Sequence, residues 1–265
     1  MWNWSHLGIF FVLSLLVCLC GFKKYVYFMS IGYGFSVAAI GAAMAVLGLM
    51  GSYGPLTLAH YIQFALFVIY GFRLSGFLLI REIKNAAYRK TLAEATGSEV
   101  PVFVKFFMWI TMGVLYVSQT SGVAFRLFNG AGSSAVQWIG IAISAFGIGL
   151  EAIADKQKSA QKAKRPDMVA TEQLYKIVRC PNYFGEILFW TGVTVSCLDC
   201  LKGLGQWITV IIAYILIVFI MFNGAQRLEK RQMARYGSNA EYKAYADKTP
   251  IIIPLLPVYH LNKQN

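Results

Sequence analysis

The chain has 265 residues, of which 57% are hydrophobic and 14% are charged, and its formal net charge is +12. Soluble domains carry about 25% charged residues, so this composition excludes an ordinary soluble globular protein. A positive net charge is typical of nucleic-acid binding only where the basic residues lie on a soluble face, and so apolar a chain fits that class poorly.

Apolar runs long enough to cross a bilayer recur along the chain. A hydrocarbon core of about 30 Å takes about 20 helical residues. The first apolar run is short, as in a signal peptide, but two lysines follow it and none precedes it, which favours a mature span. We predict an all-α polytopic membrane protein with about seven transmembrane helices in a single domain, 1–265. The predicted spans are 7–22, 26–50, 56–80, 102–125, 135–154, 184–200 and 205–225.

Lysine and arginine are distributed unevenly between the two sets of connecting loops. One set contains only Arg126 and Lys202, and most other basic residues lie in the loops 23–25, 81–101, 155–183 and 226–265. Because basic loops stay in the cytoplasm, the amino terminus is predicted outside and the carboxy terminus inside. Attraction to anionic lipid explains part of this charge. The remainder would suit a cytoplasmic funnel for a phosphate-bearing ligand.

Cysteine and histidine give no metal or catalytic signature. The five cysteines have no histidines at zinc-ligand spacing, so no metal site is predicted. Cys197 and Cys200 form a Cys-x-x-Cys sequence, which is either a disulfide in an oxidising compartment or a pair of small apolar residues. The three histidines are scattered, which gives no support to a histidine-based catalytic dyad.

Ionisable residues within predicted spans are the first functional signal. Arg73 lies in the third span, Glu151 and Asp155 lie at the end of the fifth, and Glu186 lies near the start of the sixth. Such residues cost a few kcal/mol in lipid and are rarely retained without a role or a partner. Each is explained equally well by a structural ion pair, but their shared position at the cytoplasmic ends favours one polar cavity.

The most informative segment is Arg-Cys-Pro-Asn-Tyr-Phe-Gly-Glu, 179–186. Pro181 disfavours helix at the residue before it, so a helix is predicted to start here with Asn182 as its N-cap. Gly185 permits a close backbone approach. A helix N-terminus attracts anions, and Arg179 precedes it directly. A simple capping device explains the same residues without a ligand.

This segment, together with Glu-Ala-Ile-Ala-Asp-x-Gln at 151–157, resembles the steroid 5-alpha-reductase-like superfamily, in particular its bacterial branch. That superfamily is related to sterol reductases and to isoprenylcysteine carboxyl methyltransferases. Leu228-Glu229-x-Arg231, Tyr236-Gly237, Tyr242 and Thr249-Pro250 fit the same pattern, so the specific similarity covers about 140–257. A weaker similarity rests on Tyr53-Gly54-Pro55 and Tyr70-x-x-Arg73.

The resemblance implies a multi-pass protein of the bacterial inner membrane that holds NADPH in a site facing the cytoplasm. Hydride would pass from the nicotinamide to a conjugated C=C bond of a lipophilic enone such as a 3-oxo-Δ4 steroid. Residues 1–150 would be mainly substrate-side, and 151–257 would bind the cofactor. Tyr70 is implied as the group that faces the substrate carbonyl, with Arg73 beside it. The implied cofactor contacts are Glu151, Asp155, Lys164, Arg179, Asn182, Tyr183, Glu186, Arg227 and Arg231.

Two departures from the family pattern affect the substrate and the cofactor contacts. Steroid reductases grip the 3-keto group with a glutamate that precedes the tyrosine, whereas no acidic residue precedes Glu82 here. Tyr33 and Gln63 are candidates to replace that glutamate. Cys180 stands where bacterial relatives usually have histidine, and Glu151 stands where the steroid enzymes have asparagine.

Two other functions compete with reduction. A membrane methyltransferase of the isoprenylcysteine or phospholipid type would use S-adenosylmethionine and shares a similar cytoplasmic motif, usually with histidine at its start. A non-enzymatic lipid-binding or transport protein would place acidic residues along a path across the bilayer. The expected partners are a lipophilic small molecule and membrane lipid, without nucleic acid, and the oligomeric state stays open.

Overall fold

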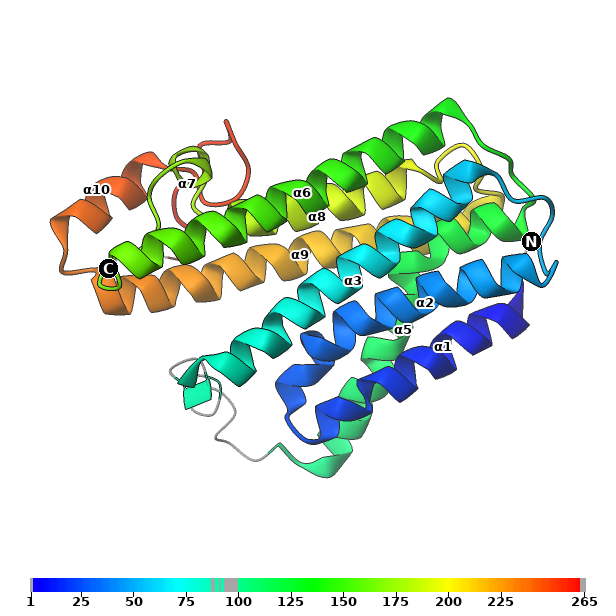
Figure 1. The fold of residues 1–265 in the computed structure, drawn as a ribbon, viewed down its shortest axis with the longest axis horizontal. Helices are drawn as coiled ribbons and strands as arrows, with labels where there is room; N and C mark the ends of the chain where they lie inside the picture. Colours follow the sequence, from blue (N-terminus) through cyan, green and yellow to red (C-terminus); the bar gives the residue numbers. More distant parts are fainter. Residues whose placement is uncertain (1, 87–88, 91, 93–99, 263–265) are drawn as a thin grey trace. The chain divides into compact units, whose positions relative to one another are not determined.

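The computed structural model describes residues 2–86, 89–90, 92 and 100–262. Within these residues the chain forms helices and no strand (Figure 1). Parts of two predicted cytoplasmic loops, 81–101 and 226–265, lie outside the described residues. The helices are α1 (Trp4–Cys18), α2 (Ile31–Leu49), α3 (Leu58–Lys84), α5 (Val102–Phe128), α6 (Ala135–Lys164), α7 (Leu174–Ile177), α8 (Pro181–Val195), α9 (Gly203–Tyr236) and α10 (Ala240–Lys248), with 3₁₀ turns at Leu19–Phe22 and Tyr25–Met29.

The prediction of an all-helical polytopic membrane protein is confirmed. Six helical segments of the described chain are long and apolar enough to span a membrane. The seventh predicted span, 184–200, corresponds to α8, which has 15 residues. At 1.5 Å per residue α8 is about 22 Å long, shorter than a hydrocarbon core of about 30 Å. The number of crossings and the orientation therefore stay predictions.

The chain divides into two compact units that are discontinuous in sequence. Unit 1 comprises residues 1–141 and 193–213, and unit 2 comprises 142–192 and 214–265. Unit 2 therefore holds most of the region 151–257 that was predicted to bind the cofactor. We describe each unit separately.

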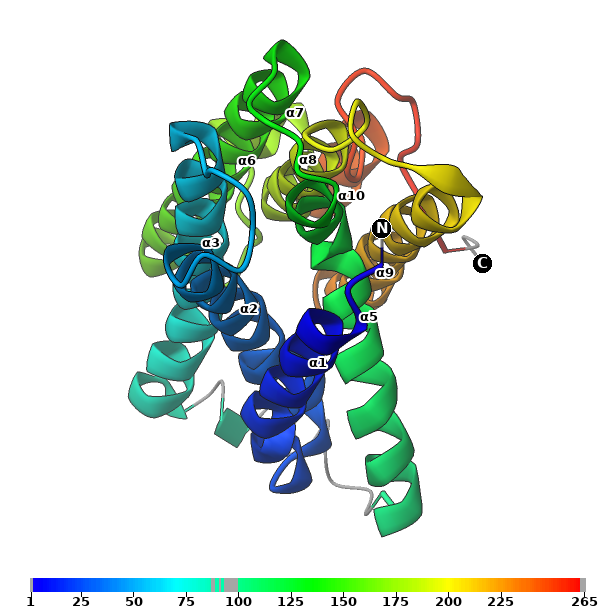
Figure 2. The ribbon, with the colours of Figure 1, turned by 90° about the vertical axis from the view of Figure 1, so that its right-hand side faces the viewer.

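Unit 1 is built on close contact between α2 and α3. A Cβ atom on Gly71 would lie 2.1 Å from the carbonyl oxygen of Gly34, so only glycine fits there. The buried Ser75 hydroxyl donates to the Ile31 carbonyl at 2.8 Å. Helix α2 also packs on α5, and it lies between α3 and α5 in Figure 2. This arrangement follows the membrane rule that small residues let helix backbones approach.

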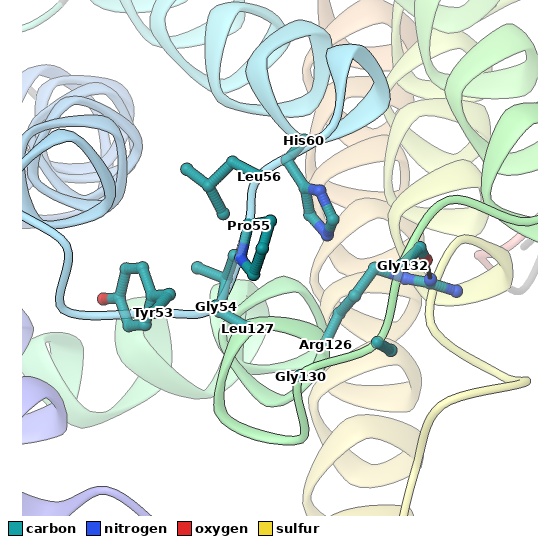
Figure 3. A pocket seen from close by; sticks show the side chains of 10 residues that line it. Tyr53, Gly54, Pro55, Leu56, His60, Arg126, Leu127, Gly130 and Gly132 are labelled. Atoms are coloured by element: carbon teal, nitrogen blue, oxygen red, sulfur yellow. Dashed lines mark hydrogen bonds between the residues drawn. The ribbon is translucent and has the colours of Figure 1, made fainter.

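One end of unit 1 is organised around Arg126, a buried residue at the end of α5. Its guanidinium donates to the Ser196 carbonyl at 3.1 Å and forms an ion pair with Asp199. It also donates to the Gly132 carbonyl and to the Ser134 hydroxyl. We call this region, which also includes 53–57, the Arg126 end (Figure 3). Its ion pair joins α5 to the segment 193–213, which belongs to unit 1 despite its distance in sequence.

The Cys-x-x-Cys sequence lies in the turn that follows α8. Both thiols are free and buried, and each donates to a backbone carbonyl three residues earlier, that of Thr194 or Cys197, at 3.0 Å. Of the two interpretations of this sequence, the structure favours small apolar residues over a disulfide.

Candidate functional site

The core of the candidate site is a close contact between α6 and α8 in unit 2. A Cβ on Gly185 would lie 2.8 Å from the Gly147 carbonyl oxygen and 2.9 Å from the Glu151 nitrogen. The two backbones approach because both contact positions are glycine. This contact brings the first turn of α8 beside Glu151. Glu151 and Glu186 are only 3% and 5% exposed.

The loop between α6 and α7 folds back along α6. The Gln161 side chain accepts hydrogen bonds from the Thr171 and Glu172 nitrogens at 2.9 and 3.0 Å. The Tyr175 hydroxyl donates to the Ala154 carbonyl at 3.3 Å. Burial raises the pKa of Tyr175 well above its ordinary value, and the charge of Asp155 raises it further. Asp155 therefore lies close enough to the returning loop for its charge to act on Tyr175.

Helix α8 begins at Pro181, in accordance with the preference of proline for the first helical position. The predicted N-cap role of Asn182 is wrong, because the helix starts one residue earlier and places Asn182 inside its first turn. The nitrogens of Arg179 and Cys180 donate to the carbonyls of Pro250 and Ile251 at 2.8 and 2.9 Å. The chain after α10 therefore holds the entry to α8 by backbone pairing.

Cys180 lies immediately before α8 and is buried. Burial raises its pKa to about 11, although Lys158 and Arg179 lower it in part. A thiol with this pKa is protonated at neutral pH, and so it is a poor nucleophile. This chain therefore places a small neutral group immediately before α8.

Arg179 forms a buried ion pair with Glu229 of α9. The Arg179 Nη2 atom lies 2.7 Å from Glu229 Oε1, and both side chains are 3% exposed or less. Arg179 also donates to the Tyr259 carbonyl. The second oxygen of Glu229 accepts from the nitrogens of Leu261 and Asn262 at 2.9 and 3.0 Å. The Arg179 charge is thus balanced within the protein, whereas its predicted contact with the cofactor stays a prediction.

His260 extends this network to α10. Its Nδ1 lies 3.0 Å from Glu229 Oε1, and its Nε2 lies 3.0 Å from Asp247 Oδ1. Sequence reasoning missed both Glu229 as a structural partner and His260. The pattern Leu228-Glu229-x-Arg231 contained the only signal, and it gave no role for the glutamate.

Tyr183 faces the basic side of α9. A Cβ on Gly224 would lie 3.4 Å from the Tyr183 ring, so the ring packs against a helix surface without a side chain. The charges of Glu186, Arg231 and Arg227 all act on the Tyr183 hydroxyl. Both arginines are exposed on α9. Tyr183 therefore lies within the electrostatic reach of two predicted basic groups of α9 and of the predicted carboxylate Glu186.

Lys164 lies apart from this group. It is exposed at the last position of α6, about 13 Å along the helix axis from Asp155 at 1.5 Å per residue. The neighbouring Lys162 is used structurally, since its ammonium donates to the carbonyls of Pro166 and Met168 at 2.7 and 2.8 Å.

Tyr70 and Arg73, the two implied catalytic residues, belong to α3 in unit 1. The buried Tyr70 hydroxyl donates to the Tyr33 hydroxyl of α2 at 2.9 Å. Tyr33 also stacks at a tilt on Tyr116, with ring centroids 5.2 Å apart. Arg73 lies one turn after Tyr70 and is partly buried. Unit 1 thus contains a buried pair of phenols, one of which was proposed from sequence to replace the missing glutamate.

Comparison with known proteins gives one match. No curated protein and no solved structure matches the chain. One protein-family model matches residues 26–249. This range includes the phenol pair of unit 1, the α6–α8 contact and the Arg179–Glu229 ion pair. Since the match covers most of the sequence, the chain belongs to the family described as a protein of unknown function, DUF1295.

Proposed function

We propose that this protein is an NADPH-dependent reductase of a conjugated C=C bond in a lipophilic enone. The resemblance of 140–257 to steroid 5-alpha-reductase-like enzymes supports this proposal. The observation that carries it is the α6–α8 contact, which buries the carboxylates of Glu151 and Glu186, while the charges of the exposed Arg227 and Arg231 of α9 act on the neighbouring Tyr183 hydroxyl. An ionisable residue within a membrane span is by default a hypothesis of a functional site.

The chemistry of these groups fits the proposed cofactor. Arg227 and Arg231 are exposed cations that would bind phosphate groups. Glu151, Asp155 and Glu186 are hydrogen-bond acceptors that would bind ribose hydroxyls and the nicotinamide carboxamide. When bound, NADPH would supply the hydride. The protein would orient the cofactor and exclude water from the site.

The proposal assigns the substrate carbonyl to Tyr70. Addition of hydride to the β-carbon of an enone places negative charge on the carbonyl oxygen. A positioned hydroxyl stabilises that charge and delivers the proton. In the structure the Tyr70 hydroxyl donates its single proton to the Tyr33 hydroxyl. To donate to a substrate carbonyl, Tyr70 would have to exchange this partner, with Tyr33 donating to the Tyr70 oxygen instead. Tyr70→Phe is therefore expected to retain NADPH binding and to slow turnover, and normal turnover by this variant would remove the assignment.

The decisive experiment compares two cofactors on the detergent-purified protein. NADPH is expected to raise the melting temperature and to change the nicotinamide fluorescence, whereas S-adenosylmethionine should do neither. If S-adenosylmethionine stabilises the protein and NADPH has no effect, reduction is wrong and methyl transfer takes its place.

Variants of α8 test where the cofactor binds. Glu186→Gln and Asn182→Ala are expected to weaken NADPH binding. Glu241→Gln is the matched control, because Glu241 is an exposed carboxylate whose ion pair is with the equally exposed Arg165. If all three variants bind NADPH with equal affinity, the cofactor does not bind at the start of α8.

A further inference from the structure

The chain after α10 contains an apolar segment that is buried at its start and exposed in its middle. Residues 250–259 carry no charged side chain. Ile251 and Ile252 are only 2% and 1% exposed. By contrast, Leu255 is 99% exposed and Leu256 is 44% exposed. Apolar side chains gain free energy when they leave water, so these two leucines are poorly placed for an aqueous surface.

Backbone hydrogen bonds close this segment into a compact loop. The Ile251 nitrogen donates to the Val258 carbonyl at 2.9 Å, and the Val258 nitrogen donates to the Leu256 carbonyl at 2.7 Å. We call residues 253–257 of this loop the apolar tip. Leu255 adopts a φ of 65° there, a left-handed conformation that is unfavourable for a bulky side chain. Strained residues of this kind cluster at functional sites. Loop closure thus holds Leu255 outward, where it makes almost no packing contact within the chain.

Hydrogen bonds on both sides of the apolar tip fix its level along the helices of unit 2. Before the tip, residues 250–251 pair with 179–180 immediately before α8, and the chain runs beside α7 in Figure 1. After the tip, the Gln226 side chain of α9 donates to the Leu261 carbonyl at 3.1 Å. The Gln226 carbonyl accepts from the Asn262 side chain at 3.0 Å. The tip is therefore tied to the start of α8 and to Gln226 of α9.

Gln226 lies where the apolar part of α9 ends. Ile215, Leu216 and Phe219, which precede it, are apolar and 58%, 42% and 64% exposed, as expected of a helix surface that faces lipid. The charged residues of this part of α9 begin at Arg227. A change from exposed apolar residues to basic residues is typical of the boundary of a membrane span. The apolar tip is therefore tied to the chain at the level of the membrane surface.

Exposed lysines flank the apolar tip. Lys176 and Lys248 each lie within three positions of the paired residues that precede the tip, and both are exposed. Ile177, beside the first lysine, is 53% exposed. The nearby Asp247 is also exposed, but its carboxylate lies 3.0 Å from His260 Nε2. Exposed apolar residues with lysines beside them are typical of a segment that lies in the interface of a bilayer. The lysines would attract anionic headgroups.

We propose that the apolar tip inserts into the boundary between headgroups and acyl chains of the bilayer that the protein spans. Leu255 is its main anchor, and Lys176 and Lys248 bind anionic lipid headgroups. The chain after α10 is thereby held on the membrane surface. This inference goes beyond the proposed reduction and does not rest on it, because it involves neither cofactor nor substrate.

Fluorescence quenching of the full-length protein in vesicles, without NADPH, tests this placement. Pro257→Cys provides a thiol for a fluorescent label in the exposed tip and keeps both leucines. Ser238→Cys is the control, because Ser238 is exposed in the turn after α9, and that helix ends about 15 Å beyond Gln226 at 1.5 Å per residue. Protein without either substitution gives the background of the native cysteines, which is expected to be low because four of the five are buried.

The vesicles contain phosphatidylcholine and phosphatidylglycerol. A lipid with a nitroxide on its acyl chain should quench the label at position 257 several-fold more than the label at position 238. Iodide in the aqueous phase should show the opposite preference. The proposal is overturned if the nitroxide lipid quenches both labels equally, or if iodide does.

Two sets of substitutions test the anchors with the label at position 257. Glycine adopts a positive φ without strain, so Leu255→Gly should fold normally and lose most of the quenching by nitroxide lipid. Lys176→Gln combined with Lys248→Gln should reduce the quenching in vesicles that contain phosphatidylglycerol, but not in phosphatidylcholine alone. Full quenching in the Leu255 variant contradicts the anchor. Equal quenching with and without the two lysines in phosphatidylglycerol shows that anionic lipid is not the partner. Either result overturns the proposal.

Discussion

Replacing Glu229 by glutamine should be among the most damaging single changes in unit 2. The variant keeps the size of the side chain but leaves the buried Arg179 charge without its carboxylate, which lies 2.7 Å away in the wild type. Removal of one partner of a buried pair costs about 3–5 kcal/mol. Glutamine retains one acceptor for the backbone nitrogens of the tail, so we expect a loss on the order of 3 kcal/mol.

The loss should have a specific location. Glu229 binds residues 260–262, and Arg179 donates to the Tyr259 carbonyl and adjoins the pairing of 179–180 with Pro250 and Ile251. Hydrogen exchange in detergent should therefore show faster exchange in the segment after α10 and at the start of α8, with little change in unit 1. Melting temperature gives the overall loss.

Two controls separate this reasoning from a general sensitivity to charge removal. Glu241→Gln breaks an exposed two-point pair with Arg165 and should have little effect on stability. The double variant Arg179→Met with Glu229→Met should regain much of the stability lost by Glu229→Gln, because paired apolar residues replace buried ion pairs well. If Glu229→Gln costs no more than Glu241→Gln, the assignment of the pair as a structural anchor is refuted.

Three further predictions concern packing, redox state and pH. Gly185→Ala should lower the melting temperature because its Cβ would meet α6 backbone atoms, whereas Gly149→Ala, whose Cβ would meet nothing within 4 Å, should be neutral or stabilising; equal effects would argue against the α6–α8 contact. After denaturation, a thiol-reactive reagent should label both cysteines of the Cys-x-x-Cys sequence without prior reduction. A reducing agent should leave the melting temperature unchanged, since a drop would reveal a disulfide. The hydrogen bond from Arg165 holds the pKa of Glu241 below its ordinary value. The ion pair should therefore be fully formed above the ordinary glutamate pKa of about 4.3. It should be lost only as the pH falls through the lowered pKa that Glu241 has in the folded protein. An NMR titration should show this shift disappearing in Arg165→Gln, and an ordinary midpoint in the wild type would contradict the pairing.

The apolar runs predicted the helices well, because a helix that spans a membrane needs a long, continuous run of apolar residues. The predicted span 102–125 corresponds to α5, Val102–Phe128. The predicted span 205–225 corresponds to the first part of the longer helix α9, Gly203–Tyr236. The cytoplasmic extensions of α6 and α9 were harder to place, because polar residues there carry no membrane signal. The start of α8 was misplaced by two residues, because an N-cap at Asn182 predicts Tyr183 as the first helical residue and the helix begins at Pro181; proline and asparagine are both favoured near a helix start.

The candidate site shows where local sequence is insufficient. The Gly185 approach could be predicted, because a glycine within a helical pattern often indicates close backbone contact. The partner of Arg179 could not, since Glu229 lies 50 positions later and nothing in its neighbourhood distinguishes it from other acidic residues. The hydrogen bond between Tyr70 and Tyr33 could not be predicted either, because the two residues lie far apart in the sequence. Sequence reasoning thus found which residues are unusual, whereas the structure determines which of them bind each other.

The discontinuity of unit 1 has a consequence for biosynthesis. Helix α5 is complete once Arg126 has been added to the chain, but its partner Asp199 lies 73 positions later. An arginine at the centre of a span costs about 2.5–3.5 kcal/mol during insertion, but Arg126 lies in the last turn of α5. Until 193–213 is synthesised, its charge must therefore be satisfied at the membrane surface by water, lipid headgroups or the insertion machinery. Unit 1 starts first and yet reaches its final form only after much of unit 2 has left the ribosome.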